Sequence, residues 1–159
     1  MSQIASFTVL RASDVPHLGF WSKPKPRLFR KPESKFEELL RPHVLRENTF
    51  GEADGVYVAL VCAWIDSLAG SFSKQADPVI DSVRKNLAGS HWLLKFADQR
   101  LLALLDTPCS ESDWRTFQRK IDIEDASEFD RGTFDGARVF VRERLSELKP
   151  DEAMLVSIG

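Results

Sequence analysis

Apolar residues recur at helical spacing along most of the chain, whereas alternating, strand-like patterns are few. The longest apolar run covers residues 56–65 and continues towards Gly70, with Asp54 just before it. Asp at an N-cap and Gly just past the last turn are typical helix boundaries, so we predict a helix here. Because this segment is apolar on nearly all sides, we expect it at the centre of the domain.

Further helices are expected where capping residues precede apolar residues spaced three or four apart. These segments are residues 34–41, 77–88 and 90–106, one from 110 or 112 to 121, and one from 133 or 135 to 149. Strand patterns occur only at residues 4–10, which alternate weakly, and at residues 153–158, which are almost wholly apolar. The predicted fold is therefore mainly α, with α+β as the alternative. We expect five or six helices around a central buried helix, with one or two short strands.

The apolar segment at residues 153–158 is expected to need a strand partner, because its backbone N–H and C=O groups would otherwise be unpaired. The sequence leaves two arrangements open. Either this segment pairs with residues 7–10, or its partners lie beyond Gly159.

The front of the chain is basic and rich in proline. Residues 22–32 contain three prolines, which disfavour a helix and favour an extended path. We therefore divide the chain into a basic N-terminal arm, residues 1–32, and a helical globular domain, residues 33–159. The arm carries five closely spaced cations that are candidates for contact with an anionic surface: Lys23, Lys25, Arg27, Arg30 and Lys31.

Charge is unevenly distributed, with a net +5 through residue 46, −7 in the remainder and −2 in total. This balance, without any nucleic-acid-binding signature, argues against nucleic acid as a partner and favours a protein. No apolar run approaches the roughly 20 residues that a transmembrane helix requires, and no Sec-type signal peptide is visible. We expect a cytoplasmic protein, or one delivered into a host cell without a Sec signal.

Candidate chemistry is sparse. The three histidines are scattered and the two cysteines, Cys62 and Cys109, are far apart, so no metal site and no cofactor are expected. The helix expected at residues 90–106 would hold His91 and Cys109 about 24 Å apart, which excludes a Cys–His pair between them. The sequence also lacks the motifs of phosphate-binding loops, zinc proteases and α/β-hydrolases.

One segment has a family resemblance. Gly55 and Tyr57 open the predicted central helix, and Trp64 follows seven residues after Tyr57 on the same face. This pattern resembles the nucleophile helix of papain-like cysteine proteases of the YopT type, bacterial virulence effectors in which a Gly-x-Cys opens that helix and a Trp follows. The resemblance extends over residues 48–159, including the apolar segment at the C-terminus, which in that family precedes the strand with the catalytic His.

The resemblance implies the helical lobe of a papain-like fold, with a vestigial site formed by Asn48, Gly55, Tyr57 and Trp64. Tyr57 stands where the nucleophilic Cys should be, and a phenol with a pKa near 10 is a poor nucleophile at neutral pH. Cys62 does not replace it, because five residues along a helix turn its side chain about 140° away. The implied catalytic His and Asp would lie beyond Gly159.

Two functions are therefore expected. The first is a catalytically inactive or truncated relative of a YopT-type effector protease, which acts at most by binding a protein. The alternative is a stand-alone helical protein-interaction domain of the immunity or adaptor type, unrelated to proteases. In neither case is the chain expected to carry a competent Cys-His-Asp set.

Overall fold

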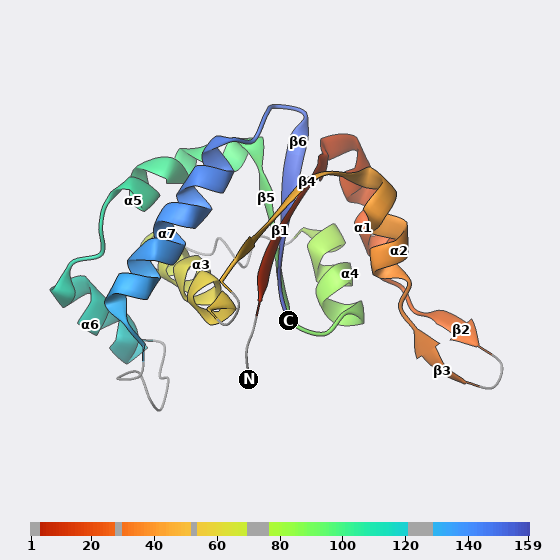
Figure 1. Cartoon of the computed structure of the whole chain (residues 1–159), viewed down its shortest axis with the longest axis horizontal. Coiled ribbons are helices and arrows are strands. Elements are labelled where there is room, and N and C mark those ends of the chain that lie inside the picture. The colour runs from red at the N-terminus through yellow and green to blue at the C-terminus, as the bar shows by residue number, and fades with distance from the viewer. Residues whose placement is uncertain (1–3, 28–29, 52–53, 70–76, 121–128) are drawn as a thin grey trace.

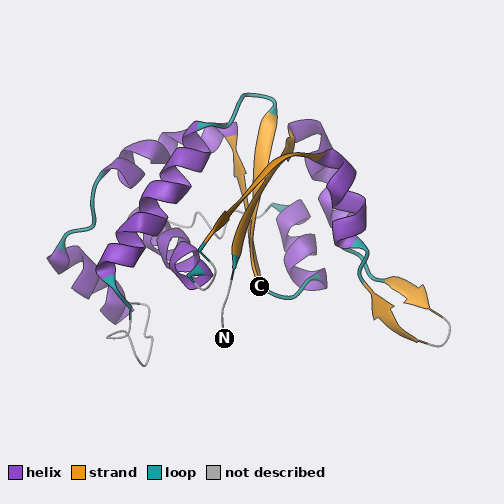
Figure 2. Cartoon of the chain, in the orientation of Figure 1, coloured by secondary structure: helices purple, strands orange, loops and turns teal. Residues whose placement is uncertain are grey.

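The structure, a computed structural model, describes residues 4–27, 30–51, 54–69, 77–120 and 129–159. The main body has three layers, in which helices pack against both faces of a four-stranded antiparallel sheet (Figure 1). A small two-stranded hairpin projects outward from one side of this body (Figure 2). The sheet therefore separates two hydrophobic cores, one on each face.

The sheet combines segments that are far apart in the sequence. In their spatial order across the sheet, the strands are β4 (Val44–Phe50), β1 (Ala5–Arg11), β6 (Glu152–Ile158) and β5 (Ser90–Lys95). The central strands β1 and β6 are the most deeply buried, because helices cover both of their faces. Successive side chains on a strand point to opposite faces, so each central strand supplies apolar groups to both cores.

Four helices cover one face of the sheet. They are α3 (Gly55–Ala69), α5 (Leu102–Asp106), α6 (Glu111–Lys120) and α7 (Arg131–Ser146). Their core contains Phe7 and Met154 from the sheet together with Val58 of α3 and Phe134 of α7, all fully buried. Burying apolar side chains of this size stabilises the fold by roughly 1.5–3 kcal/mol each.

Three helices cover the other face: α1 (Val15–Trp21), α2 (Phe36–Leu40) and α4 (Pro78–Asn86). Leu10 and Leu155 of the sheet pack against Leu18 of α1 in this second core. The cap predicted for α4 is confirmed, since the Asp77 carboxylate accepts a hydrogen bond of 3.0 Å from the Val79 amide. Pro78 then occupies the first helical position, where its missing N–H removes no helical hydrogen bond.

The prediction of a mainly α fold is wrong, because the described residues form a four-stranded sheet and a separate hairpin. The segment expected as one helix, residues 90–106, is β5 followed by a 3₁₀ helix (Phe96–Leu101) and the short α5. Its apolar spacing is compatible with a helix, but β6 pairs with the backbone of β5 along its whole length. The strand β4 was not predicted, since its inward-facing positions include the polar Arg46 and Asn48.

The predictions of a helix over the long apolar run and of a C-terminal strand are confirmed, but the helix lies in one layer on a face of the sheet and not at the centre of the domain. Helix α3 has Val58 and Val61 fully buried in the core. Strand β6 pairs with β1 over its full length, from Ala5 opposite Ile158 to Arg11 opposite Glu152. The arrangement in which this strand pairs near the N-terminus is therefore the observed one, and β5 occupies its other side.

The first 32 residues are divided between the main body and the hairpin. Strand β1 lies inside the sheet and α1 packs on it, whereas β2 (Lys25–Arg27) and β3 (Arg30–Glu33) form the projecting hairpin (Figure 1). Two more 3₁₀ helices, Ala12–Asp14 and Arg41–His43, connect neighbouring elements. The boundary expected at residue 32 therefore does not separate an arm from the globular body.

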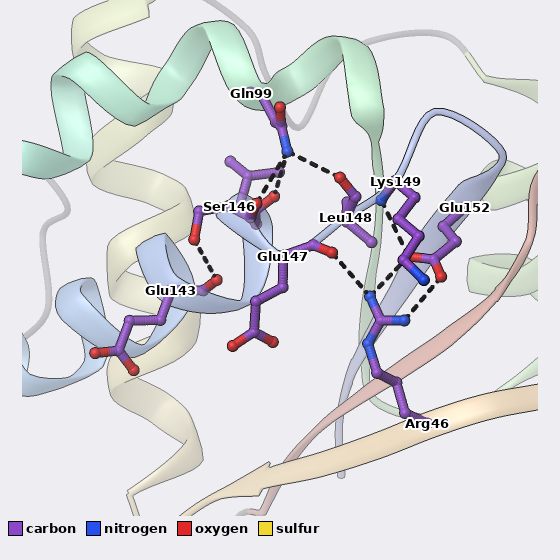
Figure 3. Close-up of polar contacts among 9 residues, drawn as sticks. Arg46, Gln99, Glu143, Ser146, Glu147, Leu148, Lys149 and Glu152 are labelled. Carbon is purple, nitrogen blue, oxygen red and sulfur yellow. Dashed lines mark hydrogen bonds and ion pairs between the residues drawn. The ribbon is translucent and has the colours of Figure 1, made fainter.

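A charged pair joins the edge strand β4 to the start of β6 (Figure 3). The Arg46 guanidinium donates to both carboxylate oxygens of Glu152 at 2.8 and 2.7 Å, and also to the Glu147 carbonyl oxygen at 3.1 Å. The Lys149 amide donates to the same carboxylate at 3.0 Å. The hydrogen bond from Arg46 is the main reason that the pKa of Glu152 is lowered to about 2, so this buried carboxylate is ionised at neutral pH.

Next to this pair, one glutamine covers the end of α7. The Gln99 side-chain amide donates to the carbonyl oxygens of Leu145 at 3.1 Å and Leu148 at 3.0 Å, with a longer bond of 3.3 Å to Ser146 (Figure 3). Helix C-termini leave carbonyl groups without intrahelical partners. Gln99 therefore supplies hydrogen-bond donors to the carbonyl groups at the C-terminal end of α7, just before the chain enters β6.

Candidate functional site

Tyr57, at the position where the resemblance implies a nucleophile, lies inside the first core. Its side chain is 9% exposed, and its hydroxyl accepts a hydrogen bond of 3.0 Å from the Asp130 amide. The ring packs edge-on against Phe129, with the ring centroids 5.6 Å apart. The hydroxyl therefore connects the first turn of α3 to the start of α7 as part of the packed interior.

Trp64 is also a core residue, 4% exposed, and its ring meets Phe134 edge-on at 5.8 Å. Gly55 is buried at the start of α3. Asn48 lies on β4, where its side-chain oxygen accepts a hydrogen bond of 3.3 Å from Arg144 of α7. The four residues of the expected vestigial site therefore lie in buried or half-buried packing positions.

The two cysteines are unpaired, and neither is suited to nucleophilic chemistry. Burial in an apolar environment raises the pKa of the Cys62 thiol to about 12. Burial, together with the charge of nearby Asp135, raises the pKa of the Cys109 thiol to about 11. Only the thiolate is an effective nucleophile, so both groups are inert at neutral pH.

The helix that would have separated His91 from Cys109 does not exist, so that reason for excluding the pair is wrong. A different arrangement keeps them apart. His91 lines a pocket on the side of α2, whereas Cys109 belongs to the core beneath α3 and α7. The sheet lies between these two regions.

The five basic residues proposed for anionic contact lie on or beside the projecting hairpin. Lys23 is exposed just before β2, Lys25 and Arg27 lie on β2, and Arg30 and Lys31 lie on β3. The register places Arg27 directly opposite Arg30. Like charges at opposite positions destabilise a strand pair. The same register places Lys25 opposite Glu33, so the strand pair combines one like-charge and one opposite-charge position.

The root of the hairpin is anchored to the main body by aromatic stacking. Trp21 contacts two imidazole rings, with centroid distances of 5.6 Å to His17 and 4.5 Å to His43. His43 also approaches the Asp14 carboxylate at 3.3 Å. The hydroxyl of the fully buried Ser22 accepts a further hydrogen bond of 3.1 Å from α4. The residues just before β2 are therefore held against the main body of the domain.

An exposed aromatic side chain accompanies these charges. Phe20, on the last turn of α1, is 68% exposed, far more than its neighbours Trp21 and Leu18. It is the most exposed large apolar side chain among the described residues. We use the name hairpin surface for Phe20 together with the residues of β2 and β3.

Sequence reasoning identified the cations of the hairpin surface but missed the hairpin itself. The segment between β2 and β3 lacks the Asn-Gly or Asp-Gly pair that predicts a two-residue turn. Three prolines in the same region instead suggested an unpaired extended chain. The basic residues Lys23, Lys25 and Arg27 occur at every second position, and this alternation was the available sequence signal for a strand.

Comparison of the chain with models of protein families, with curated proteins and with solved structures finds no significant match. Within the described residues, no group of three or more His, Cys, Asp or Glu side chains is arranged to hold a metal ion. In the same part of the chain, every helix is too short or too polar to cross a membrane. Evidence about function therefore comes from the arrangement of the residues described above.

Proposed function

We propose that this chain is a protein-binding domain whose hairpin surface contacts an acidic patch on its partner. The observation that carries this proposal is the projecting hairpin, in which the register places Arg27 and Arg30 at opposite positions of the strand pair. An acidic partner would form charge-assisted hydrogen bonds with guanidinium groups. Phe20 adds an aromatic contact of the kind that is enriched in interface centres.

The charge distribution favours a protein over an extended polyanion. The chain beyond residue 46 has a net charge of −7, and this would repel a nucleic acid lying along the domain. A compact acidic patch on a folded protein can meet the hairpin alone. The two buried, unpaired cysteines also suit a reducing compartment, such as the cytoplasm of the producing cell or of a host.

The relationship to YopT-type proteases stays a prediction, and protein binding through the hairpin does not depend on it. A stand-alone interaction domain is the simpler form of the proposal, because Tyr57 and Trp64 serve as core residues here. It would be an α+β domain, since the sheet replaces the helical architecture expected from the sequence.

A charge-reversal experiment tests the proposal. The probe is a short labelled peptide rich in Glu and Asp, with a Gln/Asn peptide of equal length as reference, and binding is followed by fluorescence anisotropy. We expect Arg27→Glu with Arg30→Glu to weaken binding of the acidic peptide about tenfold, equivalent to about 1.4 kcal/mol. Binding should also weaken as salt is added, because dissolved ions screen the attraction between the peptide and the basic residues.

The matched control reverses two arginines on α6. Arg115 and Arg119 are exposed and lie far along the chain from the hairpin. Arg115→Glu with Arg119→Glu changes the net charge by the same amount, so it should weaken binding much less. Equal weakening by both double variants, or stronger binding to single-stranded DNA or anionic vesicles than to the acidic peptide, would overturn the proposal.

A further inference from the structure

A pocket of about 420 Å³ opens on the face of the sheet that α2 covers, near the ends of β1, β5 and β6. Its polar side chains are Ser6, Ser34, Glu37, His91 and Ser157. The remaining wall is largely apolar. It is thus a mixed pocket of the kind that binds small molecules, with a few polar groups converging on an apolar space.

Three of the polar side chains form a row across the sheet. The register places Ser157 of β6 directly opposite Ser6 of β1 on one side and His91 of β5 on the other. Aligned residues on neighbouring strands point to the same face. Ser157 is also the one polar residue between Ala153 and Ile158, in a strand otherwise buried by apolar side chains.

The two hydrogen bonds of His91 show that the Ser157 hydroxyl is the donor in its bond to the imidazole. Its Nε2 lies 2.9 Å from the Ala88 carbonyl oxygen, and its Nδ1 lies 3.0 Å from the Ser157 hydroxyl. A carbonyl oxygen can only accept, so in the neutral ring Nε2 carries the proton and Nδ1 has a free lone pair. The Ser157 hydroxyl therefore donates to Nδ1, which is the arrangement of a nucleophile with its base.

The surroundings keep this imidazole neutral. Burial lowers the pKa of His91, since the ring is 6% exposed, and the positive charge of Arg84 lowers it further. The Ala88 carbonyl and the Glu37 carboxylate act in the opposite direction. The net shift is downward, so the ring is unprotonated at neutral pH and can accept a proton.

We propose that Ser157 and His91 form a catalytic pair that hydrolyses small esters bound in this pocket. Ser157 is the nucleophile and His91 is the general base. The Ala88 carbonyl holds the imidazole in the required tautomer, as a carboxylate does in other serine hydrolases. Ser6 lies opposite the nucleophile in the same pocket, where its hydroxyl can donate to the developing oxyanion.

The reaction proceeds in two stages. The Ser157 oxygen bonds to the ester carbonyl carbon while His91 Nδ1 takes the hydroxyl proton. The bond to the alcohol then breaks, and His91 returns the proton to the leaving alkoxide. In the second stage His91 deprotonates a water molecule, which attacks the acyl-serine. The carboxylic acid is released as Ser157 recovers its proton.

The pocket restricts the substrate. Phe36, Leu87 and Ile158 supply apolar surface for a short acyl chain. The exposed Glu37 carboxylate at its wall disfavours an anionic ester and favours a neutral or cationic one. Acetyl and butyryl esters are of a size that a 420 Å³ pocket holds.

The test uses p-nitrophenyl butyrate and a fluorophosphonate probe, which a nucleophilic serine attacks with loss of fluoride. We expect Ser157→Ala and His91→Gln to lower kcat/KM for the ester by about 100-fold. Mass spectrometry of the labelled protein should find the phosphonate on Ser157. The pH profile of kcat/KM should rise with a midpoint below pH 6.5, as the lowered pKa of His91 requires.

Surface histidines also cleave activated esters, so the exposed His17→Gln variant is the matched control and should retain full activity. The variant Ser157→Cys guards against misfolding of the alanine variant. Its thiol beside His91 should react with iodoacetamide at neutral pH, whereas the two native thiols are buried. An ester rate unchanged by Ser157→Ala, no phosphonate on Ser157, or an unreactive thiol in Ser157→Cys would each overturn the proposal.

Discussion

Two hydroxyl groups, Tyr57 and Ser157, lie on opposite sides of the sheet and have opposite hydrogen-bonding roles. Tyr57 accepts from the Asp130 amide inside a packed core. Ser157 lines a pocket and shares a hydrogen bond with His91, which as a neutral base accepts its proton. The family resemblance placed the reactive position at Tyr57. The hydrogen bond to His91 and the adjoining pocket instead favour Ser157 as the nucleophile. The chemistry of a hydroxyl group therefore depends on the acceptor beside it and on whether a substrate can reach it.

The largest effect is expected from the core around Tyr57. Trp64→Ala should destabilise the protein by roughly 3–5 kcal/mol, because it removes a 4% exposed indole that packs against Phe134. Urea unfolding measures this loss. The exposed Phe20→Ala serves as reference and should change stability by no more than about 0.5 kcal/mol. A loss below about 1 kcal/mol for Trp64→Ala would mean that this helix is not the centre of the core.

A smaller effect is expected at the charged pair that holds β4 against β6. Glu152→Gln should cost about 2 kcal/mol, since Arg46 would lose its bidentate carboxylate partner. The pH dependence has a defined sign. The folded pKa of Glu152, about 2, lies below its ordinary value of 4.5, so its stabilisation is present above pH 4.5 and is lost as pH falls towards 2.

Chemical unfolding at several pH values checks this second prediction. The wild type should lose more stability than Glu152→Gln between pH 4.5 and 2. Parallel losses in the two proteins would show that other carboxylates dominate acid unfolding. Neither hydroxyl takes part in this ion pair, so the experiment shows whether the sheet that carries Ser157 is held together as described.

The Tyr57 hydroxyl itself should have a modest structural effect. Tyr57→Phe is expected to cost about 1 kcal/mol, because it leaves the Asp130 amide without its acceptor. Ester hydrolysis should be unchanged in this variant, whereas Ser157→Ala should lower kcat/KM by about 100-fold. Thermal unfolding compares the stability of the two variants, and the ester assay compares their activity. Loss of activity in Tyr57→Phe alone would reverse the assignment of the two hydroxyls.

The smallest effect is expected from protonation of His91. Its folded pKa is lowered, mainly by burial, so its contribution to stability is present above the unfolded value of 6.5 and declines as pH falls through the folded pKa. Wild type and His91→Gln should therefore converge in stability on mild acidification. A difference between them that grows below pH 6.5 would contradict the neutral imidazole on which the Ser157 pair depends.

Sequence patterns predicted the elements whose signals are local. Helix α3 follows from a long apolar run between Asp54 and Gly70, and α4 from the Asp77-Pro78 cap. Strand β6 was recognisable as a buried strand, and its pairing with β1 was one of two expected arrangements. These signals lie within about a dozen residues, because capping and periodicity are properties of adjacent turns.

Elements that depend on a remote partner were not predictable in this way. β5 has helix-compatible spacing and becomes a strand because β6 pairs with it from the other end of the chain. β4 places the polar Arg46 inward, where Glu152 neutralises it across 106 positions of sequence. Neither strand can be recognised from its neighbouring residues, because the segment that stabilises it is distant in the sequence.

Local sequence patterns are sufficient to predict a folded domain with a long apolar helix, a buried last strand and a cluster of cations near the front. Long-range packing places the cations on or beside a projecting hairpin and encloses Tyr57. It also brought His91 to Ser157 across 66 positions of sequence. The physical reason is that strand register and burial arise from long-range backbone pairing, which aligns distant side chains on one face of a sheet.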